Sequence, residues 1–277
     1  MPTVGGPAFA ITGGKAIGCD AVQLFTASPR QWRALVIKPE AVAAFQAAKL
    51  ETQISKTVAH DSYLINLAAA PSSEVLEKSR TAFRAEIERA EMLSIDFLVS
   101  HPGAHMGAGD DAGIAQIIES LDIIHAETPG VRVRTALETT AGQGTYLGGH
   151  FSHLARILNG VKHPERLAVC LDTCHIFVGG YDIRTPVGYA ETMAQFDEII
   201  GLAQLQVVHA NDSKGAFGSH LDRHEHIGDG EIGLEAFRLL VNDPRLFGIP
   251  VIVETPDSET MHAVNVARLR ALLHTAE

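Results

Sequence analysis

The stretch Leu167-Ala-Val-Cys-Leu-Asp172 (LAVCLD) is apolar without alternation and ends in a carboxylate. A strand that is apolar on both faces is typical of a parallel sheet with helices on both sides. Six other short runs rich in apolar and β-branched residues are also expected to be strands. They are Ala21–Phe25 (AVQLF), Thr57–His60 (TVAH), Phe97–His101 (FLVSH), Val133–Glu138 (VRTALE), Leu205–His209 (LQVVH) and Pro250–Glu254 (PVIVE).

Longer stretches with apolar residues three and four positions apart separate these strands, as in Ser73–Leu93 and Ile114–Ala126. Ser258 or Thr260 is expected to cap a last helix that ends near His274. This alternation predicts an α/β fold with a parallel sheet. Seven repeats suit a (β/α)₈ barrel better than an open sheet, with one strand unaccounted for. No linker or break in composition divides residues 1–277, so a single domain is expected.

The composition narrows the class of protein. The chain has 277 residues, of which 46% are hydrophobic, and it has no apolar run long enough to span a membrane. The N-terminal MPTVGGPAFA lacks the pattern of a signal peptide. Three cysteines are too few for a disulfide framework, which favours the cytoplasm. The formal net charge of −11 argues against a broad basic face for nucleic acid, although a local cationic site remains open.

The ends of the expected strands carry a second pattern. Six consecutive strands end in a residue type that binds metals: His60, His101, Glu138, Asp172, His209 and Glu254. In a barrel these ends share one rim, where active sites are built. Glu138 and Glu254 end apolar runs, and a buried carboxylate costs several kcal/mol unless it is paired or bound to a metal. A cation near the barrel axis accounts for both glutamates.

Two more pairs follow these strands closely. Asp172 and His175 form a D-x-x-H pair, and Asp222 and His224 lie in the histidine-rich loop HLDRHEHIGDG at residues 220–230. We expect this loop to fold over the barrel mouth and to bring a carboxylate and an imidazole to the cluster. No functional role is expected for the other histidines, and packing roles are expected for Cys170 and Cys174.

Several blocks carry a resemblance to a known family. They are HDSYLIN (60–66), HPGAH (101–105), LETTAGQG (137–144), LDTCH (171–175), HANDSKGAFGSHLDRHEHIG (209–228) and VIVET (251–255). Together they resemble the signature blocks of the endonuclease IV family of apurinic/apyrimidinic (AP) endonucleases. The resemblance implies a TIM barrel with three zinc ions that cleaves DNA 5′ to an abasic site and leaves a 3′-hydroxyl. It also implies cleaning of blocked 3′ ends, a role in base excision repair in the bacterial cytoplasm and nucleoid, and a monomer.

The resemblance also implies roles for individual residues. The first zinc would be held by His60, His101 and Glu138, the second by Glu138, Asp172, His209 and Glu254, and the third by His175, Asp222 and His224. Glu138 would be the catalytic bridge between the first two ions. Arg30, Tyr63 and Leu64 match positions that press into the DNA helix.

Two features depart from the family pattern. Family members usually begin with a strand of the type IGAHVS, whereas this chain starts MPTVGG, so the first barrel strand is expected to be missing or a stub. A barrel without one strand would leave the edges of its neighbours unpaired. The usual Asn after the bridging glutamate is Thr139.

The expected site suits phosphodiester cleavage. Five histidines and four carboxylates are a mixed donor set that zinc accepts. Three Zn²⁺ ions against four carboxylates leave a charge of about +2, which would grip a phosphodiester. One alternative is a sugar isomerase or epimerase that uses only Glu138, Asp172, His209 and Glu254 with one or two Mn²⁺ or Mg²⁺ ions. Another is a degenerate barrel that binds damaged DNA without cutting it.

Overall fold

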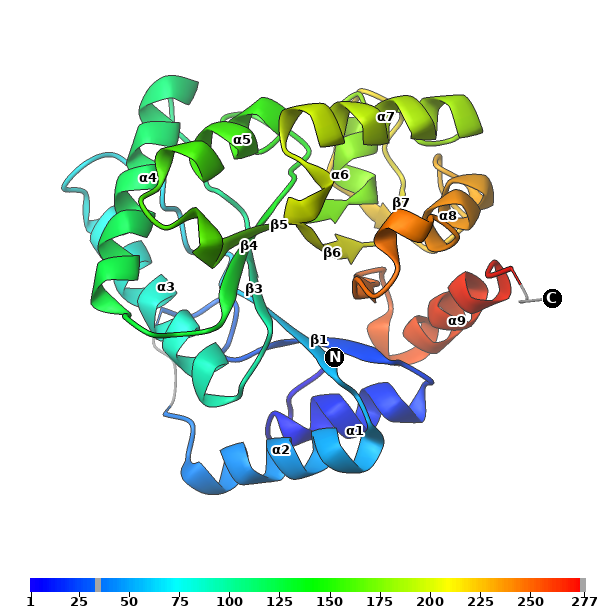
Figure 1. Ribbon diagram of the computed structural model, residues 1–277, viewed down its shortest axis with the longest axis horizontal. Helices are drawn as coiled ribbons and strands as arrows, with labels where there is room; N and C mark the ends of the chain where they lie inside the picture. Colours follow the sequence, from blue (N-terminus) through cyan, green and yellow to red (C-terminus); the bar gives the residue numbers. More distant parts are fainter. Residues whose placement is uncertain (33–35, 275–277) are drawn as a thin grey trace.

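The computed structural model describes residues 1–32 and 36–274. Seven parallel strands form a nearly closed barrel, with helices around the outside (Figure 1). In their order around the barrel the strands are β1 (Ala21–Phe25), β2 (Lys56–His60), β3 (Phe97–Ser100), β4 (Arg134–Glu138), β5 (Leu167–Asp172), β6 (Leu205–His209) and β9 (Val251–Ile252). A short antiparallel pair, β7 (Asp212–Ser213) and β8 (His224–Glu225), lies in the loop after β6. The expected barrel is therefore confirmed, with strand bounds within a few residues of the prediction.

Helices follow most of the strands and cover the barrel. They are α1 (Ala8–Ala16), α2 (Pro39–Thr52), α3 (Glu74–Met92), α4 (Asp110–Glu127), α5 (Phe151–Gly160), α6 (Thr173–Val178), α7 (Pro186–Ile199), α8 (Leu234–Val241) and α9 (Ser258–Ala271), with 3₁₀ turns at Pro164–Arg166, Leu202–Gln204 and Pro244–Leu246. No helix among the described residues is both long and apolar enough to cross a membrane.

The continuous apolar pattern of β5 follows from its two different neighbours. Ala168 and Cys170 point inward and join a small core inside the barrel. Leu167, Val169 and Leu171 point outward into the larger core between barrel and helices. Since both faces of the strand are dry, no position along it favours a polar residue until Asp172 reaches the rim.

Two helix starts differ from the sequence predictions. The helix expected from Ile114 begins four residues earlier, at Asp110, whose carboxylate contacts imidazoles of His105 and His153 at 3.5 and 3.3 Å. The prediction that Ser258 or Thr260 caps the last helix is wrong, because Asp257 occupies the capping position. Its φ of 52° turns the chain so sharply that Ser258 is already the first helical residue.

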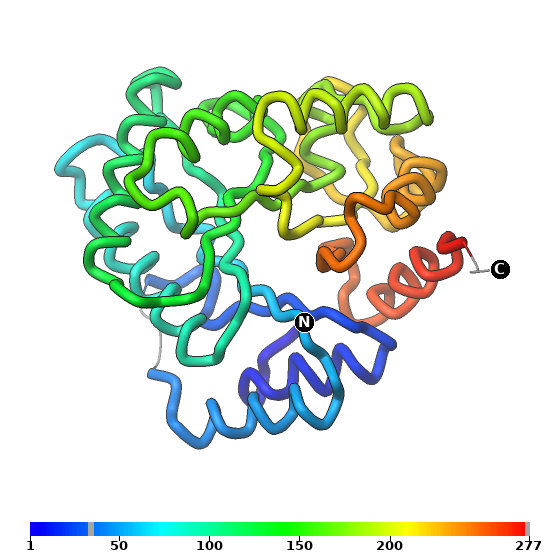
Figure 2. The backbone as a smooth tube through the Cα atoms, in the orientation of Figure 1, coloured from blue at the N-terminus to red at the C-terminus, as the bar shows by residue number. Residues whose placement is uncertain are grey.

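A seam separates the two end strands of the sheet, β1 and β9. Among the described residues these strands share no ladder of backbone hydrogen bonds. Residues 1–6 form no strand; instead, the amino group of Met1 donates to the carbonyl oxygen of Gln23 on the free edge of β1. Figure 2 shows the N-terminus near the centre of the view and α9 at the periphery. The expectation of a reduced first strand is met.

Candidate metal centre

The fully buried side chain of Glu138 lies between side chains from several strand ends at the carboxyl rim. Its Oε2 atom is 3.2 Å from His60 Nε2 and 3.2 Å from His101 Nε2. Its Oε1 atom is 3.0 Å from His209 Nδ1. The strands β2, β3 and β4 pair in parallel, so their carboxyl ends meet here. The two oxygens of Glu138 face different groups of imidazoles, which is the geometry of a carboxylate that can bridge two cations.

Asp172 and Glu254 complete a second group around Glu138 and His209. His209 Nδ1 is 3.1 Å from Glu254 Oε2 and 3.9 Å from Asp172 Oδ2. One ligand atom from each of the four residues lies within 4.8 Å of the others. Three carboxylates this close together repel one another unless positive charge separates them. The second group is therefore an environment that stabilises a cation.

His175, Asp222 and His224 form a third group. The Asp172 carboxylate accepts the backbone N–H of His175 at 2.9 Å and so starts α6 directly after β5. Asp222 Oδ1 lies 3.3 Å from His175 Nε2 and 3.6 Å from His224 Nε2. Both Nε2 atoms are buried and make no hydrogen bond with any described residue. Buried imidazole nitrogens without hydrogen-bond partners, beside a carboxylate, fit a bound metal ion.

Hydrogen bonds orient four of the five imidazoles. Each of the four has one ring nitrogen against an oxygen of the protein. The acceptors are the main-chain carbonyls of Asp61 for His60 (3.0 Å), of Thr139 for His175 (2.8 Å) and of Glu254 for His224 (3.2 Å), and the Gln23 side chain for His209 (2.8 Å). A carbonyl oxygen only accepts, so the nitrogen facing it carries the proton. When the imidazole is neutral, the other nitrogen carries the lone pair and faces the carboxylates, as a metal ligand must.

The loop that carries Asp222 and His224 is held in place by the buried carboxylate of Asp212. Its two oxygens accept hydrogen bonds from five backbone amides, those of Ser213, Gly228, Gly230, Ile232 and Gly233. A Cβ at Gly230 would come within 2.5 Å of Asp212 Oδ1, so only glycine allows this approach. The antiparallel pair β7–β8 then places His224 opposite Ser213. His220 donates to the carbonyl of Ala141 at 2.7 Å and pins the same loop from the other side.

The electrostatics of the mouth favour positive charge despite its burial. Burial raises the pKa of Glu138, but the imidazoles of His209 and His101 outweigh it and hold that pKa well below its usual value. Burial lowers the pKa of His60, but its hydrogen bond with Glu138 and the Glu138 charge outweigh this and raise the pKa to about 9. The pKa of His175 is raised in the same way, with the charge of Asp172 opposing burial.

The residues expected to contact DNA lie beside this centre. Tyr63 is 59% exposed, its ring centroid is 5.8 Å from that of His60, and its backbone N–H donates to the Pro29 carbonyl at 3.1 Å. The loop of Tyr63 is therefore tied to the exposed segment that carries Arg30. Tyr63 and the half-buried Leu64 line a cavity of about 550 Å³ that also reaches His60, His101 and Asp222.

Sequence reasoning missed several residues that support the centre. Gln23 and Asn211 are buried polar residues that contact expected ligands; the Asn211 amide donates to Asp172 Oδ2 at 2.7 Å. The hydroxyl of Thr139 accepts a hydrogen bond from the backbone N–H of Asp172 at 2.9 Å, so the residue that departs from the family pattern still supports an expected ligand. The sequence signal that could have identified these supporting residues is a polar residue within an apolar strand or shortly after it.

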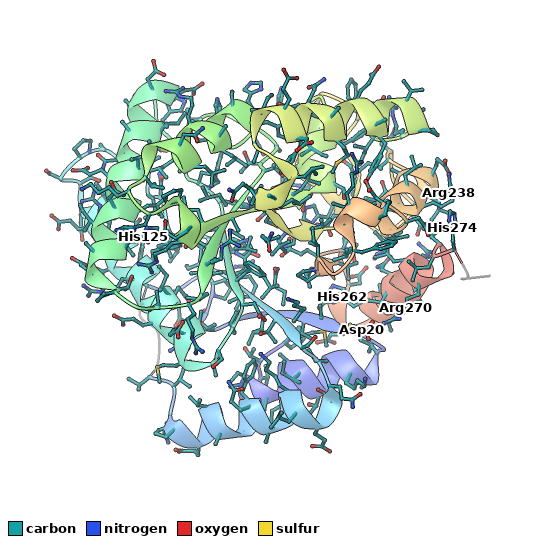
Figure 3. All side chains as sticks on the ribbon, in the orientation of Figure 1. Asp20, His125, Arg238, His262, Arg270 and His274 are labelled. Carbon is teal, nitrogen blue, oxygen red and sulfur yellow. The ribbon has the colours of Figure 1, made fainter. Side chains whose placement is uncertain are left out.

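Two buried cysteines lie near the centre, whereas His125 does not. Cys170 and Cys174 lie within ligand distance of the second and third groups. Burial raises the pKa of both thiols to about 12, so they stay protonated at neutral pH. His125 lies apart from the mouth, on α4 in the outer layer of helices (Figure 3).

Several known proteins are similar to this chain in sequence and in fold. A family model described as "Xylose isomerase-like TIM barrel" matches residues 14–272. A relative called "Probable endonuclease 4", from Chloroflexus aurantiacus, is 48% identical over 279 residues that cover 100% of this chain and 98% of the relative. The chain belongs to the endonuclease IV family.

A further relative and a solved structure are also endonuclease IV proteins, and a third match shares the fold alone. "Probable endonuclease 4" of Geotalea daltonii is 45% identical over 275 residues, which cover 99% of this chain and 96% of that protein. The crystal structure of endonuclease IV from Thermus thermophilus matches with a TM-score of 0.84 and 33% identity, covering 96% of this chain and 93% of that one. A D-tagatose 3-epimerase-like protein matches with a TM-score of 0.66 and 18% identity over 91% of this chain and 89% of that one, a likeness of fold alone.

Proposed function

We propose that this endonuclease IV family member is a zinc-dependent DNA repair hydrolase. It cleaves the backbone 5′ to abasic sites, leaves a 3′-hydroxyl, and removes blocking groups from 3′ ends during base excision repair. We also propose that it acts as a monomer on double-stranded DNA in the bacterial cytoplasm and nucleoid. The single observation that carries the proposal is that three groups of ligand atoms meet at one barrel mouth.

Each group would hold one zinc ion. His60, His101 and Glu138 would hold the first ion, and Glu138, Asp172, His209 and Glu254 the second. The third would be held by His175, Asp222 and His224. When bound, zinc supplies Lewis-acid activation of the phosphodiester and of water at neutral pH. The chain's own contribution is to orient the donors through fixed hydrogen bonds and to keep the pocket walls dry.

Glu138 has the central role among these residues. Its two oxygens face opposite groups of imidazoles at 3.0 to 3.2 Å, so this one buried carboxylate would hold both ions. Because Glu138 is fully buried, its position does not depend on a surface loop. We infer that it is the residue whose loss most reduces transition-state stabilisation.

The cavity beside the centre supports a DNA substrate with a displaced sugar. Tyr63 and Leu64 at its edge, with Arg30 nearby, would wedge into the helix where a base is absent. Extrusion of a nucleotide costs least at a site with no base to unstack. No surface that reads bases is needed, so flanking sequence should have little effect on the rate.

The third group separates this function from sugar epimerisation. An epimerase of the same fold needs only the second group, which leaves His175, Asp222 and His224 without a role. The buried Nε2 atoms of His175 and His224, which lack hydrogen bonds within the described chain, therefore favour the three-ion centre.

Two measurements on the purified protein test the proposal. Elemental analysis should give about three zinc ions per chain, and a duplex with one abasic analogue should be nicked on its 5′ side. A chelator should abolish nicking, and added zinc should restore it. One or two manganese ions per chain with no nicking would contradict the proposal and favour an epimerase. Retention of the duplex without cleavage would indicate a protein that only binds damage.

A further inference from the structure

Gln23 lies inside the barrel, at the seam between β1 and β9. Val22 and Leu24 pack into the outer core, whereas Ala21 packs against the inner core. Because side chains alternate along a strand, Gln23 points inward with Ala21. Its side chain is 7% exposed, so its amide needs partners within the protein.

Both ends of the Gln23 amide contact expected ligands of the second ion. Its Nε2 atom donates to Glu254 Oε1 at 2.5 Å, and its Oε1 atom lies 2.8 Å from His209 Nε2. Since the amide nitrogen faces a carboxylate, the amide oxygen must face the imidazole, and His209 Nε2 donates to it. His209 therefore presents Nδ1 to the centre, whereas His60, His175 and His224 present Nε2.

The acceptors of the other imidazoles are of a different kind. His60, His175 and His224 donate to main-chain carbonyls, whose positions are set by the backbone. Only His209, among the imidazoles with an assigned acceptor in the described residues, relies on a side chain. That side chain also spans the one place where the barrel wall has no ladder among the described residues.

We propose that Gln23 is a positioning residue for the second metal ion. It fixes the tautomer and orientation of His209 and the rotamer of Glu254. Main-chain carbonyls orient His60, His175 and His224, and the Gln23 side chain has the same role for His209 across the seam. This inference rests on the proposed zinc centre. Groups that orient metal ligands typically contribute about 10- to 100-fold to metal affinity.

The opposite end of the seam offers a matched control. There the Arg270 guanidinium of α9 donates to the carbonyl oxygen of Gly18 and to the carboxylate of Asp20 (Figure 3). This contact also joins the two sides of the seam, but it touches none of the nine expected ligands. An Arg270→Met variant therefore loosens the seam without altering the orientation of His209.

The experiment compares Gln23→Met, Gln23→Ala, Arg270→Met and the unchanged protein. Zinc affinity is measured by chelator competition, and the ligand field by the visible absorption spectrum of the Co²⁺-loaded protein. Circular dichroism of each metal-free variant establishes that it is folded. We expect both Gln23 variants to bind one ion about 10- to 100-fold more weakly, with an altered cobalt spectrum. We expect Arg270→Met to match the unchanged protein in both readouts.

Two results would overturn the inference. One is unchanged zinc affinity and cobalt spectrum in the folded Gln23 variants. The other is an equal loss of affinity in Arg270→Met, which would assign the effect to closure of the seam rather than to orientation of ligands. A parallel nicking assay on the unchanged protein keeps the proposals apart. Zinc binding without incision would reject the proposed nuclease, while the affinity ratios would still decide the role of Gln23.

Discussion

Buried histidines in two regions of this molecule have pKa values that are shifted in opposite directions. At the barrel mouth, carboxylates outweigh burial and raise the pKa of His60 to about 9. On α4, burial and then the charges of Arg166 and His163 lower the pKa of His125 to about 4. His125 is 3% exposed, and its ring nitrogens make no hydrogen bond within the described chain. Burial and neighbouring cations therefore disfavour a charge on His125, whereas the mouth accepts a cation because carboxylates surround it.

The largest expected effect comes from removing the negative charge at the centre of the mouth. Glu138→Gln keeps the shape of the side chain but cannot hold two cations at a fixed spacing. We expect the rate of abasic-site cleavage to fall at least about a thousandfold while the fold is retained. The measurement is kcat on a duplex with one abasic analogue, with zinc content measured on the same sample. A near-normal rate with zinc bound would remove Glu138 from its proposed role.

A smaller effect is expected from the anchor of the loop that completes the mouth. In Asp212→Asn, one carboxylate oxygen becomes an amide nitrogen that faces backbone N–H groups and cannot accept from them. We expect stability to fall by about 3 kcal/mol and the zinc ion proposed for the third group to bind more weakly, since Asp222 and His224 lie on this loop. Urea unfolding and the zinc count per chain measure the two effects. Glu231→Gln, on the same loop, is the control. An Asp212→Asn variant with unchanged stability and full zinc content would show that the loop keeps its conformation without the Asp212 carboxylate.

The acid–base contrast also predicts proton release when metal binds. At pH 7 the metal-free mouth holds protonated imidazoles, because the pKa of His60 is about 9 and those of His175 and His209 are also raised. Zinc needs neutral imidazole, so binding should release about one proton or more per chain. Calorimetry of zinc binding in buffers of different ionisation enthalpy measures this number. Heats that do not depend on the buffer would mean that the mouth is already deprotonated.

The smallest expected effect concerns His125 and acid stability. The unfolded chain binds a proton at this residue near pH 6.5, whereas the folded protein resists it until about pH 4. The unfolded state therefore holds more protons between these values, and stability falls as pH decreases from about 6.5 to 4. A His125→Leu variant should show a flatter decline of Tm over this range. An equal decline of Tm in the two proteins would mean that protonation of His125 does not destabilise the folded state.

Much of the fold was predictable because its signals are local. β5 is apolar throughout since both its faces are dry, and its end at Asp172 coincides with the rim. The sequence does not predict the start of α4 because Asp110 also contacts His153, which lies far away along the chain. The wrong cap of α9 reflects a backbone turn at Asp257 that no periodicity reports.

The nine expected ligands could be named because strand ends and family blocks single them out. Their supports could not be, since the sequence shows Gln23 only as one polar residue in an apolar strand. Asp212 is likewise one of several acidic residues near the loop, and only the folded chain shows five amides around it. Hydrogen-bond partners that are 231 residues apart, as Gln23 and Glu254 are, leave no spacing pattern to read.

The seam between β1 and β9 also predicts which strands of the barrel should separate first. β3, β4 and β5 each have a strand on both sides, whereas β1 and β9 each have one within the described chain. Amide protons of β1 and β9 should therefore exchange with deuterated solvent before those of β4, through local separation rather than global unfolding. Bound zinc would slow this exchange, because Gln23 and Glu254 join the metal pocket to both margins of the seam.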